Sequence, residues 1–245
     1  MKVDVALLPK ELAQIDLSQR MVVVFDCLRA TTTMTAALSA GVNEIRIFSD
    51  PSAAHAAGAQ FGPDRLLCGE QNCLPPPGFD LGNSPGSFTA THAGRTLFMS
   101  TTNGTRAILA AKNAAQLLIG ALVNASAVAR QVIRAGRDTL LLCAGTNGQV
   151  AMEDLIGCGA VLSALEPLGR VHLASDTARI ARRLFDSARE DLPAALRQSQ
   201  GGQNVLAAGL SADIDYAARL DSTGLVGRAQ EDEGQMKIQK INPAG

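Results

Sequence analysis

The stretch "MVVVFDCLRATTTMTAALSAG", residues 21–41, contains the pattern that decides the fold. Its first five residues are apolar, as expected for a strand that is buried on both faces of a sheet. Residues 31–41 are predicted to form a helix that ends at Gly41, because glycine suits a helix C-terminus. Between them stand an acid, Asp26, and a base, Arg29, which a core does not need. We therefore expect a strand–turn–helix unit whose turn carries a polar site.

The same alternation recurs along the chain. Short apolar runs, bounded mostly by Gly, Pro, Asp or Asn, occur at 3–8, 44–50, 64–70, 95–101, 116–122, 138–145 and 170–176. Ala-rich stretches typical of helices lie at 52–60, 105–114, 124–136 and 153–165. Apolar strands that alternate with helices predict an α/β fold, a three-layer α/β/α arrangement around a mixed, largely parallel sheet.

The last third of the chain is less regular. We expect a helix at 174–190 capped by Asp176, a second at 211–221, and a last edge strand at 235–241. No linker rich in Pro or Ser divides the sequence, which predicts one domain over residues 1–245. Residues 22–50 and 140–176 resemble each other. Either a βαβ unit was duplicated, giving halves of about 1–135 and 136–245, or the likeness is common to any two such units.

The composition excludes several classes of function. Hydrophobic residues make up 47% of the 245, charged residues 18%, and the formal net charge is −1. Such a chain is globular and has no broad field for nucleic acid or anionic lipid. The first residues lack the clean apolar run of a signal peptide, and no apolar stretch is long enough to span a bilayer. We expect a cytoplasmic protein without nucleic-acid or membrane partners; the oligomeric state stays open, a homodimer included.

Cysteine and histidine give little sign of a metal site. The five Cys include no C-x-x-C pair, and the three His are scattered without ligand spacing. Cys68 and Cys143 lie in apolar runs and are predicted to be core residues. A zinc or thiolate site is therefore disfavoured.

The turn after residues 21–25 could bind a phosphorylated ligand. The predicted helix begins with Thr31, Thr32 and Thr33, and a helix N-terminus offers free N–H groups to anions. Arg29 could hold two phosphate oxygens at once, and Asp26 could hold a divalent cation or attack phosphorus. A simple helix cap is the alternative, but a cap needs one such residue rather than five.

Three more polar clusters follow predicted strands. "STTNGTR", 100–106, could cradle phosphate, although an ordinary Asn-Gly turn would explain it too. "GTNGQVAMED", 145–154, places Glu153 and Asp154 near a helix start, where paired acids suit Mg²⁺ or interact with the helix dipole for ~0.3–1 kcal/mol each. Glu70 opens the long loop 69–94, which is either a surface loop or a functional one whose Asn83 and Ser84 reach a ligand.

The predicted site combines acids that can hold a cation with hydrogen-bond donors that can bind an anion. This combination suits phosphoryl transfer. The chain has no Walker loop, because no G-x-x-x-x-G-K-[ST] occurs. It also lacks the Cys-x5-Arg loop and the D-x-D pattern of two other phosphatase classes: Thr33 stands six residues after Cys27, and Leu28 stands two after Asp26. Any phosphatase chemistry must therefore use another arrangement.

The motifs taken together resemble those of the 2-phosphosulfolactate phosphatase family (ComB). The matching pieces, in order, are "DCLRATTT", "GE-x-N", "PPGFDLGNSP", "STTNGTR", "CAGTNG…ED" and "DI…A..D" at 213–221. The resemblance spans roughly the whole chain. It implies that family's α/β fold, Mg²⁺ as cofactor, and hydrolysis of the phosphate ester of a small anionic hydroxy acid. The family's named substrate is 2-phospho-3-sulfolactate, converted to 3-sulfolactate and phosphate on the route to coenzyme M.

The resemblance also implies roles for individual residues. Catalytic roles fall on Asp26, Arg29 and Glu153, and metal binding on Asp26, Glu70, Glu153 and Asp154. Substrate binding falls on Thr31, Thr32, Asn72, Asn83, Ser84, Thr101, Thr102, Asn103, Gly104 and Arg106. Two positions depart from the family pattern, Gln71 where Arg is usual and Cys73 where Gly is usual. Gln71 lacks the positive charge with which an arginine could recognise a sulfonate. The resemblance therefore supports the reaction more strongly than it supports the sulfonated substrate.

Two other functions fit parts of the sequence. A module that binds a phosphorylated metabolite without catalysis explains the Thr- and Gly-rich turns, but not the acids. An oligomeric scaffold with incidental polar turns requires Asp26, Arg29 and Glu153 to lie far apart.

Overall fold

The run Met21–Phe25 forms strand β2 in the computed structural model, which describes residues 1–169 and 171–241. All five residues are buried, and β2 pairs in parallel with β6 on one side and β7 on the other. A strand with neighbours on both edges and helices on both faces needs apolar side chains at every position. The predicted buried strand is confirmed.

Ten strands lie within the described residues, most of them five residues long, and they form one sheet. They are β1 (Lys2–Ala6), β2, β3 (Glu44–Phe48), β4 (Arg65–Gly69), β5 (Thr96–Ser100), β6 (Gln116–Gly120), β7 (Thr139–Cys143), β8 (His172–Leu173), β9 (Gly227–Asp232) and β10 (Gln235–Lys240). The run predicted at 170–176 contributes only the two residues of β8, and residue 170 lies outside the described residues.

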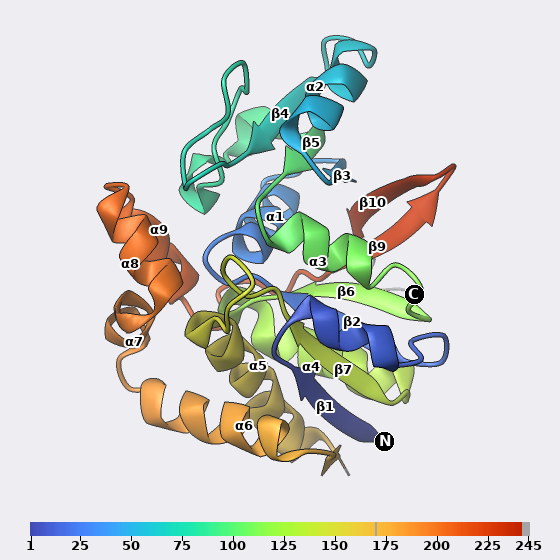
Figure 1. Cartoon of the computed structure of the whole chain (residues 1–245), viewed down its shortest axis with the longest axis vertical. Helices are drawn as coiled ribbons and strands as arrows, with labels where there is room; N and C mark the ends of the chain where they lie inside the picture. Colours follow the sequence, from blue (N-terminus) through green and yellow to red (C-terminus); the bar gives the residue numbers. More distant parts are fainter. Residues whose placement is uncertain (170, 242–245) are drawn as a thin grey trace.

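The sheet consists of two parallel blocks joined by a hairpin. The strand order is β4-β5-β3-β10-β9-β6-β2-β7-β1-β8. Antiparallel pairing at β3–β10, β10–β9 and β9–β6 makes the two blocks run in opposite senses. Figure 1 shows β4 and β5 in the upper part, β2 and β7 in the lower part, and the hairpin at the right.

The predicted edge strand at 235–241 is therefore corrected. β10 lies inside the sheet, because β9 and β3 cover its two edges. The sequence does not predict β9, because its exposed residues are polar and its partner β6 lies far away in the chain. The sheet is mixed and mostly parallel, as predicted.

Nine α-helices occur in the described part of the chain. They are α1 (Ala30–Ser39), α2 (Pro51–Ala59), α3 (Gly104–Ala110), α4 (Ala125–Ala135), α5 (Met152–Leu165), α6 (Asp176–Ala188), α7 (Leu192–Gln198), α8 (Gln200–Ala207) and α9 (Ser211–Ala217). Short 3-10 helices are η1 (Pro9–Gln14), η2 (Pro85–Ser87), η3 (Ala90–His92), η4 (Leu122–Asn124) and η5 (Glu166–Leu168). In the same residues, no helix combines the length and apolar character that a bilayer crossing requires.

The cap of α6 is a second correction. Ser175, not Asp176, is the N-cap residue, because its side chain accepts the N–H of Ala178 at 3.1 Å. Asp176 is exposed one residue further on. A boundary error of one residue is common where Ser and Asp are adjacent, since both cap helices well.

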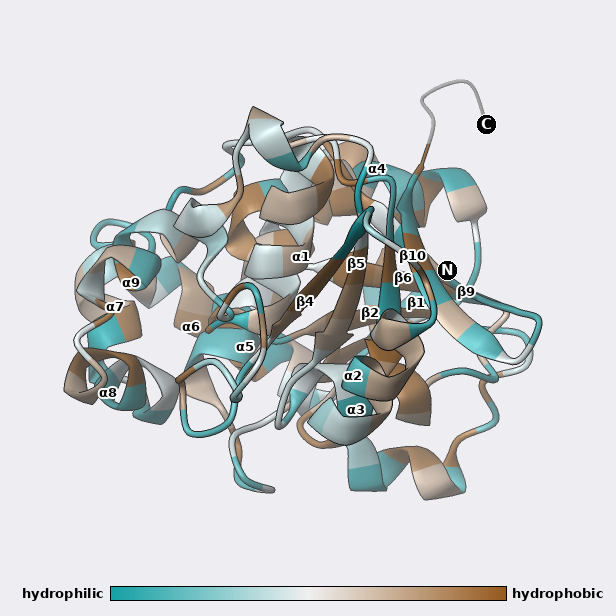
Figure 2. Cartoon of the chain, turned by 90° about the horizontal axis from the view of Figure 1, so that it is seen from above, coloured by the Kyte–Doolittle hydropathy of each residue, from teal (hydrophilic) through white to brown (hydrophobic). Residues whose placement is uncertain are grey.

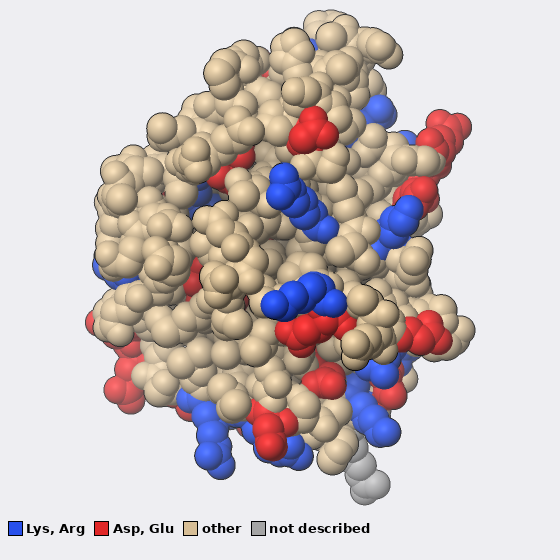
Figure 3. Space-filling view, in the orientation of Figure 1, with Lys and Arg blue, Asp and Glu red and all other residues tan. Residues whose placement is uncertain are grey.

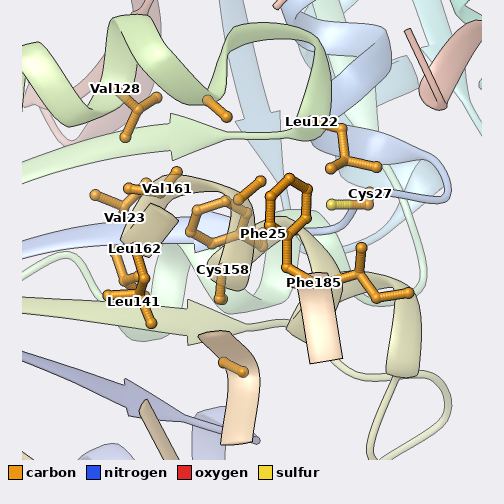
Figure 4. Close-up of a cluster of buried hydrophobic side chains, with 14 of the residues drawn as sticks. Val23, Phe25, Cys27, Leu122, Val128, Leu141, Cys158, Val161, Leu162 and Phe185 are labelled. Carbon is orange, nitrogen blue, oxygen red and sulfur yellow. The ribbon is translucent and has the colours of Figure 1, made fainter. Parts of the chain in front are cut away.

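The core has two halves, one on each face of the sheet. Val23 and Phe25 point toward α4, α5 and α6, where Figure 4 shows them among Cys158, Val161 and Phe185. The intervening β2 residues belong to the other cluster, which α1 and α3 complete. Successive strand residues point to opposite faces, so one strand anchors both helical layers.

This arrangement is the predicted α/β/α sandwich. Figure 2 shows the most hydrophobic residues concentrated on the central strands, with hydrophilic residues frequent on the outer helices. Burying each large aliphatic or aromatic side chain stabilises the fold by about 1.5–3 kcal/mol. Cys68 and Cys143 are fully buried, as predicted. The single domain and the internal repeat remain predictions.

Candidate active site

A cavity of about 480 Å³ opens where several strands of both blocks end. Its lining residues come from the turns after β2, β4, β5 and β7 and from α8. They are Asp26, Leu28, Arg29, Glu70, Asn72, Cys73, Leu74, Asn83, Thr102, Asn103, Thr146, Asn147, Gly201, Asn204, Val205, Ala207 and Ala208. The turns after β2 and β5 lie close together although the blocks run in opposite senses: a Cβ added at Gly104 would be 2.6 Å from Asp26 Oδ2. In Figure 1 the helices α7–α9 lie together at the left of the molecule.

The turn between β2 and α1 holds Asp26 at the cavity. Asp26 is 7% exposed, and its Oδ1 accepts the backbone N–H of Ala30 at 3.0 Å. Its own backbone is fixed by Thr31: the N–H of Asp26 donates to Thr31 Oγ1 at 3.0 Å, and the Thr31 hydroxyl donates to the Asp26 carbonyl at 2.9 Å. The carboxylate is therefore held at the start of α1 by local bonds.

The predicted phosphate-binding threonines have other partners. The hydroxyl of Thr32 donates to the carbonyl of Cys27 at 2.8 Å, and that of Thr33 donates to the carbonyl of Asn83 at 3.1 Å. Thr31 and Thr32 are buried and do not line the cavity. These hydroxyls shape the turn, and their contact with substrate stays a prediction.

Replacing Thr31 by Val tests this structural role. Valine keeps the shape but leaves the buried N–H and carbonyl of Asp26 without the hydroxyl. We expect the free energy of unfolding in urea to fall by about 1–3 kcal/mol. Thr102→Val is the matched control, because Thr102 is half-buried at the cavity and should change stability by less than about 0.5 kcal/mol. Unchanged stability with a raised KM in Thr31→Val would instead assign that hydroxyl to the ligand.

Arg29 is buried at the cavity wall and bound from three sides. Its Nη1 donates to Asp213 Oδ2 at 2.7 Å and to Ser84 Oγ at 3.3 Å, and its Nη2 donates to the carbonyl of Cys73 at 2.6 Å. The Ser84 hydroxyl donates to the same Asp213 oxygen at 2.7 Å. Arg29 is thus fixed by α9, by the residue before η2 and by the turn after β4.

Glu70 connects the turns that follow β4 and β5. Its Oε1 accepts the N–H of Thr102 at 2.7 Å, and its Oε2 accepts the N–H of Cys73 at 3.1 Å. Asn72, in the same turn, has a positive φ of 53° and lines the cavity. The loop 69–94 is consequently ordered at its start and contributes side chains to the site.

The turn after β5 repeats the arrangement after β2. The N–H of Thr101 donates to Thr105 Oγ1 at 3.1 Å, and the hydroxyl of Thr105 donates back to the Thr101 carbonyl at 2.9 Å. At Gly104 a Cβ would lie 2.6 Å from Asp26 Oδ2, so only glycine allows α3 to approach the carboxylate this closely. Arg106 is exposed and does not line the cavity.

Glu153 and Asp154 are adjacent in sequence but have different contacts. Asp154 accepts the N–H of Cys27 at 2.8 Å and the N–H of Gly145 at 3.0 Å, which joins the turns after β2 and β7. Glu153 lies under the first turn of α8, where a Cβ on Gly201 would be 1.9 Å from its Oε1. Its Oε2 is buried without a hydrogen-bond partner among the described residues.

Burial raises the pKa values of three acids at the site. Burial raises the pKa of Asp26 from 3.8 to about 7, and the charges of Glu70 and Glu153 add to this, while the Ala30 N–H and Arg29 oppose it. Burial also raises the pKa of Glu153 and the pKa of Asp154. Within residues 1–169 and 171–241, no three His, Cys, Asp or Glu side chains form a ready-made metal cage. A group of buried acids with raised pKa values, rather than a coordination shell, is the notable feature.

The structure brings together much of the predicted site. Seven of the predicted residues line the cavity, namely Asp26, Arg29, Glu70, Asn72, Asn83, Thr102 and Asn103. Glu153 is close enough for its charge to raise the pKa of Asp26. The scaffold hypothesis required Asp26, Arg29 and Glu153 to lie far apart, and this requirement is contradicted.

Several site residues were missed from the sequence. Asn204 and Val205 of α8 and Thr146 and Asn147 after β7 line the cavity, and Asp213 binds Arg29. The "DI" pair at 213–214 was the available signal for Asp213, and the glycine pair 201–202 was one for the close contact with Glu153. On the face shown in Figure 3, acidic and basic side chains are interspersed, so charge is concentrated only locally.

Known proteins resemble this chain over most of its length. A family model described as 2-phosphosulpholactate phosphatase matches residues 6–232. A probable 2-phosphosulfolactate phosphatase of Carboxydothermus hydrogenoformans is 35% identical over 240 residues, 98% of each chain. Proteins of the same name from Deinococcus radiodurans and Symbiobacterium thermophilum are 41% and 38% identical, covering 83% and 84% of this chain and 85% and 89% of theirs. The chain therefore belongs to the 2-phosphosulfolactate phosphatase family, a family named for the hydrolysis of a phosphoric monoester.

Proposed function

We propose that this chain hydrolyses the phosphate monoester of a small anionic hydroxy acid, with 2-phospho-3-sulfolactate as substrate and Mg²⁺ as cofactor. The named activity of the family supports the reaction class. The observation that carries the proposal is the pair of Asp26 and Arg29 in one cavity, a buried carboxylate beside a buried guanidinium. A reactive acid next to an anion-binding base is what phosphoryl transfer needs.

Arg29 has the donors to bind the phosphate. Arginine carries five N–H bonds, and three hydrogen bonds go to Asp213, Ser84 and the carbonyl of Cys73. The Nε–H and the second hydrogen on Nη2 remain for two phosphate oxygens. A planar, fixed pair of donors matches the geometry of a phosphoryl group.

Asp26 is the group that starts the reaction. Its carboxylate either attacks phosphorus, forming an acyl phosphate that water then hydrolyses, or accepts a proton from the attacking water; in both cases the ester P–O bond breaks and the hydroxy acid leaves as an alcohol after taking up a proton. Both roles need the charged carboxylate, the form that a bound cation would favour. The first role requires the same position at the cavity wall, so both remain open.

The charge of the site supports a divalent cation. Asp26 and Glu70 line the cavity, Glu153 has an unpartnered buried oxygen, and Asp26 engages only Oδ1 with Ala30. These hard oxygen donors suit Mg²⁺, and Asp26 and Glu153 are the acids best able to hold it. Glu70 and Asp154 are less suited, because each oxygen of both acids already accepts a backbone N–H. When bound, the cation supplies positive charge against the phosphoryl oxygens.

Phosphate release from a substrate panel tests the function. Purified protein is incubated with 2-phospho-3-sulfolactate, phospholactate and phosphoglycerate, each with EDTA and with EDTA followed by excess Mg²⁺. We expect release that stops with EDTA and returns with Mg²⁺. Turnover that persists with EDTA would contradict the cofactor alone. Ligands that raise the melting temperature without any release would favour the binding module over the enzyme.

A further inference from the structure

The carboxylate of Asp213 contacts Arg29, a residue of the cavity wall, but does not itself line the cavity. Its Oδ2 is 2.7 Å from Arg29 Nη1, and the two side chains are 8% and 2% exposed. Asp213 is not among the cavity-lining residues, so it does not reach a ligand there. A buried ion pair of this kind is costly unless its geometry is good and further hydrogen bonds satisfy it.

Those further bonds are present, and they come from distant parts of the chain. Ser84 donates to the same Asp213 oxygen and accepts from Arg29, while the carbonyl of Cys73 accepts from the other Arg29 nitrogen. Asp213 stands 184 residues after Arg29, on α9. Helix α9 also packs against η2, the element that Ser84 precedes. The guanidinium is therefore held in one orientation by three segments.

This orientation decides which Arg29 donors face the cavity. Nη1 is directed at Asp213 and Ser84, and Nη2 at the carbonyl of Cys73. Without the Asp213 charge, the long Arg29 side chain could rotate and donate to other acceptors, Asp26 and Glu70 among them. Such a rotation would move the free N–H groups of Arg29 away from the phosphate.

We propose that Asp213 is a positioning residue, which fixes Arg29 so that its free N–H groups meet the phosphate of the substrate. The proposal rests on the proposed function, since it takes Arg29 as the phosphate-binding base. The competing explanation is a purely structural one, in which Asp213 only pins α9 to the rest of the fold. The two differ in whether phosphate binding changes when Asp213 changes.

Asp213→Asn is the first test, because asparagine keeps the size and an acceptor oxygen while removing the charge. We expect KM for the substrate and Ki for inorganic phosphate to rise together, about tenfold or more, with a smaller change in kcat. Asp215→Asn is the matched control on the same helix. Asp215 is exposed and pairs with Arg197 at the surface, so this variant should keep both constants.

A double-mutant cycle shows whether Asp213 acts through Arg29. Arg29→Met should itself weaken phosphate binding, and adding Asp213→Asn to it should weaken binding no further. Additive losses would overturn the proposal. So would an Asp213→Asn variant that melts at a lower temperature but keeps the wild-type KM and Ki.

The same cycle can be measured without turnover. Inorganic phosphate should raise the melting temperature of the wild type and of Asp215→Asn, and this rise should be lost in Asp213→Asn and Arg29→Met. If no ester is hydrolysed but the phosphate effect follows this pattern, the proposed function fails and the positioning role stands. If phosphate does not bind to the wild type at all, Arg29 is not its site and the positioning role is overturned.

Discussion

Replacing Asp26 by Asn is expected to reduce kcat about 10³-fold or more, because both roles open to Asp26 need its negative charge. Asparagine can neither attack phosphorus as a carboxylate nor accept a proton from water. The local structure should survive, since Oδ1 of asparagine can still accept the N–H of Ala30 and the Thr31 bonds use only the backbone of residue 26.

A second measurement separates lost chemistry from lost structure. The wild-type carboxylate is buried among Glu70 and Glu153, and this environment disfavours its charge. Asp26→Asn should therefore melt at the same temperature as the wild type or higher at pH 8, as happens when a strained functional group is removed. An inactive and stable variant supports the assignment. If Asp26→Asn kept the wild-type turnover with Mg²⁺ present, the role assigned to Asp26 would be wrong, because neither mechanism works without that carboxylate.

The metal-free protein is expected to become less stable as the pH rises from 5 to 8. The pKa of Asp26 is about 7 in the folded state against 3.8 ordinarily, so between these values the folded state binds more protons than the unfolded state. Stability then falls as pH rises through that range. For Asp26 the loss between pH 5 and 8 is about 3 kcal/mol, and the raised pKa of Glu153 and of Asp154 acts in the same direction.

Mg²⁺ is expected to remove most of this loss. A cation held by the same carboxylates favours their charged forms, so its stabilising effect should be large at pH 8 and small at pH 5. Melting temperatures with EDTA and with Mg²⁺ measure this directly, at about 2–4 °C per kcal/mol for a chain of this size. Asp26→Asn should flatten the EDTA curve, whereas Asp215→Asn should not. Equal Mg²⁺ effects at both pH values would argue against a cation at these carboxylates.

Much of the fold could be predicted because its signals are local. An all-apolar run such as Met21–Phe25 suits only a strand covered on both faces, and the polar turn and helix that follow are read from neighbouring residues. The β9–β10 hairpin shows the limit of such signals. The alternation of buried and exposed residues is weak on β9. The place of the hairpin between β3 and β6 is set by pairing with strands more than 100 residues away in the chain.

In the candidate site, too, local sequence predicted some features and missed others. Asp26, Arg29 and Glu70 were visible because each follows an apolar run, where an α/β sheet presents polar groups. The "DI" and Gly-Gly motifs marked two further positions, but local sequence did not show which residues they contact. The bond from Arg29 to Asp213 and the contact of Gly201 with Glu153 join segments that no local pattern connects.

Sequence alone was sufficient for the layers, for most strands and for the acid and base that line the cavity, since each depends on near neighbours. Only the folded chain decided the use of each acid. Glu153 and Asp154 are consecutive on α5, yet the first lies under α8 and the second accepts two backbone N–H groups. Side chains about 100° apart on a helix meet different surroundings, and those surroundings exist only after distant segments have packed together.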